Sequence, residues 1–183
     1  AGRSGCMCVL LARLLQGTGG SVLAVEHIEE LAAAAEGSVR SHHGELLTSR
    51  GGPLELRCVD ARALAARPES VGAFDLVHCG AALPEPQEWL TRMLRAGGRA
   101  VVPLGPTDAP QWLCTLDRRE DGSIRVARHL RVLYVPVTSA AHQRARGACW
   151  DEVVDRCVKN SAAAGVATGE QPPASADGDD IYS

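Results

Sequence analysis

Apolar residues in the first hundred positions alternate between short continuous runs and runs that are spaced for a helix. The continuous runs predict buried strands, because a strand that is covered on both faces needs no polar alternation. These strands are expected at residues 21–25, 54–59, 74–79 and 100–104. Helices are expected between them, at residues 6–16, 26–43, 61–73 and 86–95, the third of them short or irregular. Strands that alternate with helices indicate a parallel sheet with right-handed crossovers.

Two further patterns complete the predicted fold. The stretch 6–16 is apolar almost all round, so we predict a buried helix there. After residue 110 the pattern changes to two long antiparallel strands, at 111–117 and 123–137, and the Asp121-Gly122 pair between them favours a hairpin. The predicted fold class is therefore α/β, a doubly wound and mostly parallel sheet with a C-terminal antiparallel β-hairpin.

Composition divides the chain into a domain and a tail. The sheet and its hairpin are expected to form one domain over residues 1–146, followed by a C-terminal extension at 147–160. Residues 161–183 are rich in Ala, Gly, Pro, Ser and Asp, so they are predicted to be a disordered acidic tail.

Charge and cysteine usage narrow the partners and the compartment. The net charge of −3 is concentrated in the tail, so no basic field is available to attract nucleic acid. The seven cysteines are odd in number and include no CxxC pair, which favours buried free thiols and a cytoplasmic protein. No apolar run approaches the ~20 residues of a membrane span, so no membrane partner is expected. The chain does not begin with Met, and we interpret its first residue as a fragment boundary.

Candidate chemistry gathers where the predicted parallel strands end, because ligands bind at that edge of such sheets. Gly2 and Gly5 lie before the first helix, where a glycine loop admits an anionic group or simply makes a turn. Glu26 follows the strand at 21–25 and suits either ribose hydroxyls or the start of a helix. Asp60 follows the strand at 54–59 and suits either an exocyclic amine or a helix N-cap. Small residues at 80–82 leave room at the next strand end, and together these ends favour a nucleoside cofactor.

Other polar residues are expected to be structural. His42 and His43 are expected to be solvated and His78 to lie in the core, and none has a partner at metal-ligand spacing, so no metal site is predicted. The arginines of the hairpin are expected to form a solvated face, with an acidic substrate as the less favoured interpretation; they are Arg118, Arg119, Arg125, Arg128 and Arg131.

The fold and four of its segments resemble a known family. Class I methyltransferases share the layout of an α/β sheet closed by a hairpin, and the protein-L-isoaspartate O-methyltransferase family resembles this chain over about residues 1–146. The resemblance is carried by FDLVHCGAALPEP, LRAGGRAVVPLGP, the EDGSI turn and LYVPVT followed by Gln143. It implies S-adenosyl-L-methionine as methyl donor and isoaspartyl-containing proteins or peptides as acceptors, hence protein repair by a monomeric full-length enzyme.

The resemblance also assigns cofactor-binding positions. Gly5 matches the last glycine of the family's first loop, Glu26 the ribose-binding acid and His27 its neighbour. Asp60 and Ala61 match an Asp-Gly pair that meets the adenine, while Thr138 and Gln143 match late positions that close over the cofactor.

Departures from the family pattern keep a second function open. Ala1, Arg3 and Ala61 stand where the family has glycines, which favours a non-catalytic module of the same fold or an inactive fragment. A methyltransferase for another small acceptor is a third possibility. The family's first sheet strand and its serine-bearing substrate segment align before Ala1, so the catalytic residues are unknown. Without that strand two interior edges are expected to lie open, and we predict that this chain alone is unstable or associates.

Overall fold

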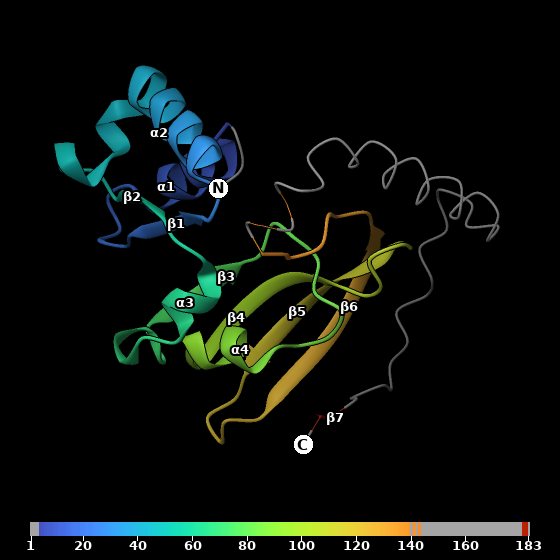
Figure 1. Ribbon diagram of the computed structural model, residues 1–183. Coiled ribbons are helices and arrows are strands. Elements are labelled where there is room, and N and C mark those ends of the chain that lie inside the picture. Colours follow the sequence, from blue (N-terminus) through green and yellow to red (C-terminus); the bar gives the residue numbers. More distant parts are fainter. Residues whose placement is uncertain (1–3, 140, 142, 144–180, 183) are drawn as a thin grey trace. The chain divides into compact units, whose positions relative to one another are not determined.

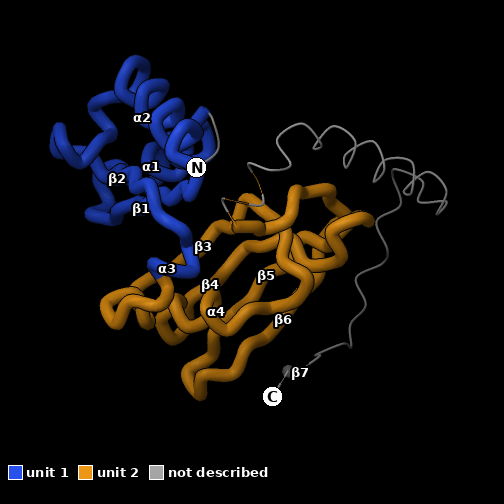
Figure 2. The backbone as a smooth tube through the Cα atoms, in the orientation of Figure 1, with its two compact units in different colours: residues 1–64 blue, residues 65–183 orange. Residues whose placement is uncertain are grey.

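The structure, a computed structural model, describes residues 4–139, 141, 143, 181 and 182 (Figure 1). The predictions for Ala1, Gly2, Arg3 and the extension at 147–160 lie outside these residues, as does all of the expected tail except 181 and 182. The chain divides into two compact units, residues 1–64 and 65–183, which Figure 2 draws in separate colours.

The first unit is a two-stranded parallel sheet with helices packed on it. Its elements are α1 (Cys6–Leu15), β1 (Val22–Glu26), α2 (Glu29–His43), short 3₁₀ turns at Gly44–Leu46 and Thr48–Arg50, β2 (Leu54–Cys58) and the start of α3 (Ala61–Ala65). The strands pair in register from Val22 opposite Leu54 to Glu26 opposite Cys58. Both strands therefore end at the same level, as the sequence predicted.

Helix α1 forms where the sequence predicted it, but the prediction that it is buried is wrong. Only Cys8 and Ala12 of this helix are buried. Met7, Leu10 and Leu14 are 43%, 52% and 68% exposed. They lie three and four positions apart and so share one side of the helix. A helix that rests on a single sheet face buries one stripe, whatever the character of its other side.

The second unit is a mixed sheet in the order β3-β4-β5-β6-β7. Its elements are a 3₁₀ turn at Pro68–Ser70, β3 (Phe74–His78), α4 (Glu88–Met93), β4 (Leu94–Leu104), β5 (Gln111–Arg118), β6 (Ile124–Val132) and β7 (Ile181–Tyr182). Strands β3 and β4 are parallel, whereas β4, β5 and β6 form antiparallel pairs. The predicted hairpin is thus confirmed, and Gly122 in its turn has the positive φ of 86° that favours glycine.

The predicted helix at 86–95 is too long at its C-terminal end. Helix α4 ends at Met93, and Leu94 already has extended backbone with φ −71° and ψ 136°. Leu94 pairs with Phe74 of β3 and is completely buried. The gain from burying a leucine in the sheet core decides this boundary, which helix propensity alone does not locate.

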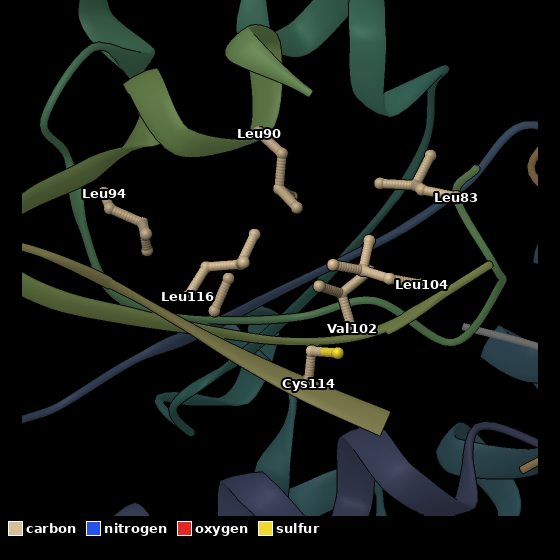
Figure 3. Close-up of a cluster of buried hydrophobic side chains, with 8 residues drawn as sticks. Leu83, Leu90, Leu94, Val102, Leu104, Cys114 and Leu116 are labelled. Carbon is tan, nitrogen blue, oxygen red and sulfur yellow. The ribbon is translucent and has the colours of Figure 1, made fainter. Parts of the chain in front are cut away.

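Leucines dominate the core of the second unit (Figure 3). Leu90 of α4 and Leu94 at the start of β4 lie with Val102, Leu104 and Leu116 on one side of the sheet. Alternate residues of β4 contribute to this core because successive strand side chains point to opposite faces. The α/β fold class with parallel strand pairs before a hairpin is confirmed.

The five described cysteines are free thiols. Cys8 and Cys114 are buried, and burial raises the pKa of both thiols. Cys6 and Cys58 are exposed at element ends, so the prediction of buried thiols holds only in part, while Cys149 and Cys157 lie outside the described residues. None of the described helices is long and apolar enough to cross a membrane.

Candidate functional site

Glu26 lies at the C-terminal end of β1, half-buried, at the edge where the sequence placed a ligand. Its Oε1 accepts hydrogen bonds from the backbone N–H groups of His27 (2.9 Å) and Ile28 (3.2 Å). Those two donors precede α2, so the side chain orders the turn into the helix. The carboxylate therefore orders the start of a helix, which was the second interpretation of Glu26. Its position at the end of β1 also suits the hydroxyls of a ribose.

Asp60 lies two residues beyond the end of β2, beside Glu26. The strands bring them together, because the Val59 N–H donates to the Glu26 carbonyl at 2.9 Å. Asp60 Oδ1 accepts from the backbone N–H of Arg62 at 2.8 Å, which is the arrangement of a helix-capping aspartate before α3. Adjacent ends of parallel strands thus carry two carboxylates, as the sequence predicted.

The Arg62 side chain holds the Asp60 carboxylate as well. Arg62 Nε lies 3.0 Å from Oδ1 and Nη2 lies 2.6 Å from Oδ2, a two-point contact. These hydrogen bonds lower the pKa of Asp60, and the charge of nearby His27 lowers it further. An amine that approached Asp60 would have to compete with this guanidinium. Arg62 was not identified as a site residue from the sequence, although the sequence shows it two positions after Asp60.

Ala61 is the first residue of α3 and is half-buried. A residue at this helical position has ordinary negative φ, so the backbone there does not need the family's glycine. The departure at Ala61 consequently adds one methyl group beside Asp60 and no strain.

Gly5 precedes α1 with a φ of 64°, and its carbonyl accepts from the Val9 N–H at 3.0 Å. A Cβ at this position would lie 2.9 Å from Cγ2 of Val39 on α2. Gly5 therefore allows both the turn into α1 and the close approach of the two helices. Both reasons are structural and hold without a ligand.

Thr138 and Gln143 belong to the second unit. The segment before Thr138 runs beside the small-residue turn after β3, since the Val137 N–H donates to the Ala82 carbonyl and the Ala82 N–H to the Val135 carbonyl, both at 2.8 Å. The Gln143 N–H donates to the Ser139 carbonyl at 2.9 Å. The structure thus joins the turn at 80–82 to the segment that carries Thr138, and it groups Gly5, Glu26, His27, Asp60 and Ala61 in the first unit.

The histidines outside this set match their predictions only in part. His43 was expected to be solvated but is half-buried at the end of α2, where its Nδ1 lies 3.4 Å from Nη2 of Arg13. His42 is exposed, as expected, and its Nδ1 lies 2.9 Å from the Ser38 carbonyl oxygen. His78 was expected in the core, but its side chain is exposed, as is Leu76 on the same face of β3.

A profile of the family described as protein-L-isoaspartate(D-aspartate) O-methyltransferase matches residues 1–142. The chain belongs to this family. The family is one of enzymes, and its profile ends just short of Gln143.

Curated relatives agree with that membership. Protein-L-isoaspartate O-methyltransferase 1 of Arabidopsis thaliana is 34% identical over 130 residues, which are 71% of this chain and 54% of that protein. The Caenorhabditis elegans protein-L-isoaspartate O-methyltransferase is 30% identical over 140 residues, 76% of this chain and 59% of that protein. The chain therefore spans about half the length of the curated relatives it matches.

A solved structure supports the fold. It is a Plasmodium falciparum protein described as a protein-L-isoaspartate O-methyltransferase, in complex with S-adenosyl-L-homocysteine. The likeness has a TM-score of 0.59 at 22% identity and covers 73% of this chain and 59% of that chain. At this identity the likeness establishes the fold, which is that of class I S-adenosylmethionine-dependent methyltransferases.

Proposed function

We propose that this chain supplies the cofactor-binding part of a protein-L-isoaspartate O-methyltransferase. The observation that carries the proposal is the pair of carboxylates, Glu26 and Asp60, at adjacent parallel strand ends in a member of this family. Two acids in that arrangement suit the two ends of a nucleoside, with hydroxyls at one and an exocyclic amine at the other. The acceptor would be the carboxylate of an L-isoaspartyl residue in a protein.

The residues present suit S-adenosylmethionine at two points. Glu26 is half-buried at the end of β1, and its carboxylate is the group that would accept the ribose hydroxyls. Asp60 is ionised at neutral pH, as an aspartate ordinarily is, and Arg62 lowers its pKa further, so it is an acceptor for an amine once Arg62 moves aside. Thr138 and Gln143 are kept as proposed cofactor-binding residues because they match late positions of the family pattern.

Bound S-adenosylmethionine supplies a methyl group on a sulfonium, and transfer forms an O–CH₃ bond as the S–CH₃ bond breaks, leaving a methyl ester and S-adenosylhomocysteine. The acceptor carboxylate is already ionised at neutral pH, so this chain need not provide a general base. Its residues would hold the methyl donor, and positioning of donor and acceptor in line can supply a large part of the rate enhancement.

Calorimetric titration of S-adenosylhomocysteine into the full chain tests the cofactor site. We expect saturable binding that falls by at least about tenfold in Glu26→Ala, since two hydroxyl hydrogen bonds to a charged group are lost. Glu120→Ala, an exposed acid in the hairpin turn, is the matched control and is expected to bind like the original chain. Equal binding by both variants would contradict the role of Glu26.

Transfer of labelled methyl groups to an isoaspartyl peptide separates an enzyme from a binding module. Methylation of the isoaspartyl peptide but not of its aspartyl counterpart would support the proposed reaction. Cofactor binding without methylation would favour the alternative, a non-catalytic module or an inactive fragment, for which the Arg62 contact with Asp60 is the supporting observation.

A further inference from the structure

A groove of about 340 Å³ lies in the second unit, on the residues that follow β3 and β4 and on strands β5 and β6. Four of the residues that line it are prolines, whose fixed φ makes this part of the lining stiff. They are Pro84, Pro86, Pro106 and Pro110. Trp112 of β5 also lines the groove, and it packs against the leucine core. The groove contains none of the seven residues assigned to the cofactor.

Two arginines of β6, Arg128 and Arg131, give the groove its charge. The guanidinium carbon of Arg131 lies 5.0 Å from the centre of the Trp112 ring, within the range of a cation–π contact. Neither arginine forms an ion pair with any acid in the described part of the chain. The groove thus presents two exposed positive charges, one of them already ordered over an aromatic ring.

A register shift in the hairpin brings these arginines together. Residues three apart on a regular strand point to opposite faces. Here Cys114 pairs with Arg128 while the preceding Leu113 pairs with Leu130, so β6 holds one extra residue, His129. The extra residue restores Arg131, which pairs with Trp112, to the face that carries Arg128. His129 points away, where its Nε2 lies 3.1 Å from the Thr115 hydroxyl.

We propose that this groove binds an extended peptide segment with acidic side chains. Guanidinium groups pair with carboxylates through two parallel hydrogen bonds, and the Trp112 ring and the prolines suit apolar parts of the same segment. The two arginines lie opposite Cys114 and Trp112, which are two strand residues apart, so they are separated by about 7 Å along the sheet. Two carboxylates two positions apart on an extended ligand have the same spacing and point to the same side.

The charge balance favours a peptide over a nucleic acid. Glu85 is another of the residues that line the groove, and the chain as a whole carries −3. A phosphate backbone needs many cationic contacts along its length, whereas one or two carboxylates need only the pair present here.

The test uses the full chain and the fluorescein-labelled peptide Gly-Glu-Leu-Asp-Pro-Gly, with a neutral counterpart in which Gln and Asn replace the acids. Fluorescence anisotropy is expected to show saturable binding of the acidic peptide and at least about tenfold weaker binding of the neutral one. The double substitution R128Q/R131Q is expected to lower the affinity for the acidic peptide by a similar factor. The control R119Q changes an exposed arginine beside the hairpin turn and is expected to leave that affinity within twofold of the original.

Three outcomes would overturn the proposal. They are equal binding of both peptides, an unchanged affinity in a double variant whose circular dichroism matches the original chain, and binding of a single-stranded oligonucleotide that displaces the peptide. All measurements are made without cofactor, so their result is independent of the proposed methyl transfer.

Discussion

The two compact units bury their apolar residues by different means. The core of the first unit combines small side chains with a few leucines: Cys8, Ala12, Ala24, Val39, Leu46, Leu47 and Leu54. The core of the second unit is built around five leucines on a sheet whose strands follow one another: Leu83, Leu90, Leu94, Leu104 and Leu116. In the second unit α4 and the segment around Leu83 cover one face of the sheet, whereas in the first unit one side of α1 stays exposed.

The comparison teaches that an apolar pattern predicts an element better than it predicts burial. In the first unit α1 leaves three large apolar side chains exposed, whereas alternate residues of β4 in the second unit are almost completely buried. The two units also differ in their charged groups. The first unit carries the acids Glu26 and Asp60 at strand ends, whereas the second carries Arg128 and Arg131 on a sheet face.

The largest expected effect comes from removing a core leucine. Leu116→Ala should lower the free energy of unfolding of the second unit by about 2–5 kcal/mol, because Leu116 is completely buried. Leu14→Ala in α1 should change stability by less than about 0.5 kcal/mol, since Leu14 is 68% exposed. Urea unfolding with two probes checks both, as Trp89 and Trp112 report on the second unit and helical circular dichroism reports mainly on the first. A large loss in Leu14→Ala would mean that the exposed side of α1 is covered in solution.

The next effect concerns the close approach of α1 and α2. Gly5→Ala and Gly17→Ala both place a side chain at positive φ, 64° and 77°, which costs about 1–2 kcal/mol. Only the alanine at position 5 would also crowd Val39, whereas the space around Gly17 is open. Gly5→Ala should therefore lose about 1–3 kcal/mol more than Gly17→Ala in thermal unfolding followed by circular dichroism. Equal losses would show that α2 shifts to accommodate the methyl group.

A smaller effect concerns access to Asp60. Arg62→Ala frees the carboxylate, so S-adenosylhomocysteine should bind about two- to fivefold more tightly, the range of an exposed ion pair. The inosine analogue lacks the exocyclic amine and should be unaffected. Arg57→Ala is the matched control, because Arg57 pairs with Glu55 at the same spacing of two. If calorimetry shows the same gain in affinity for S-adenosylhomocysteine and for the inosine analogue, the adenine does not bind at Asp60.

The smallest effect is on acid stability. Hydrogen bonds from Arg99 lower the pKa of Asp117 across the β4–β5 pair. The folded state then binds fewer protons than the unfolded state, so this contribution is complete above the unfolded pKa of about 3.9 and is lost as pH falls below it. Asp117→Asn should flatten the fall in stability between about pH 5 and pH 2, measured by urea midpoints. Glu120→Gln in the exposed turn serves as the control, and an unchanged slope in Asp117→Asn would argue against the prediction.

Much of the fold was predictable because its signals are local. Continuous apolar runs located β1, β2 and β3 to within one or two residues, and Asp121-Gly122 located the hairpin turn. The placement of Glu26 and Asp60 followed from the same reasoning, since a residue just after a parallel strand lies at the ligand edge wherever the helices pack.

Arg62 shows why the candidate site was less predictable than the strands. The capping role of Asp60 follows from its position before α3, but a guanidinium on both carboxylate oxygens depends on the rotamers of two side chains. The start of β4 at Leu94 is a similar case, because only pairing with Phe74 and burial among leucines extend the strand so far.

The sequence by itself determined the order of strands and helices, the hairpin, and the acids at the strand ends, because periodicity and turn chemistry act over a few residues. Only the tertiary structure decided which side of α1 is buried, that Arg62 holds Asp60, and that Arg128 and Arg131 share a groove with Trp112. Each of these depends on contacts between residues brought together by folding, and one unpaired residue, His129, reverses the face to which the following side chains point.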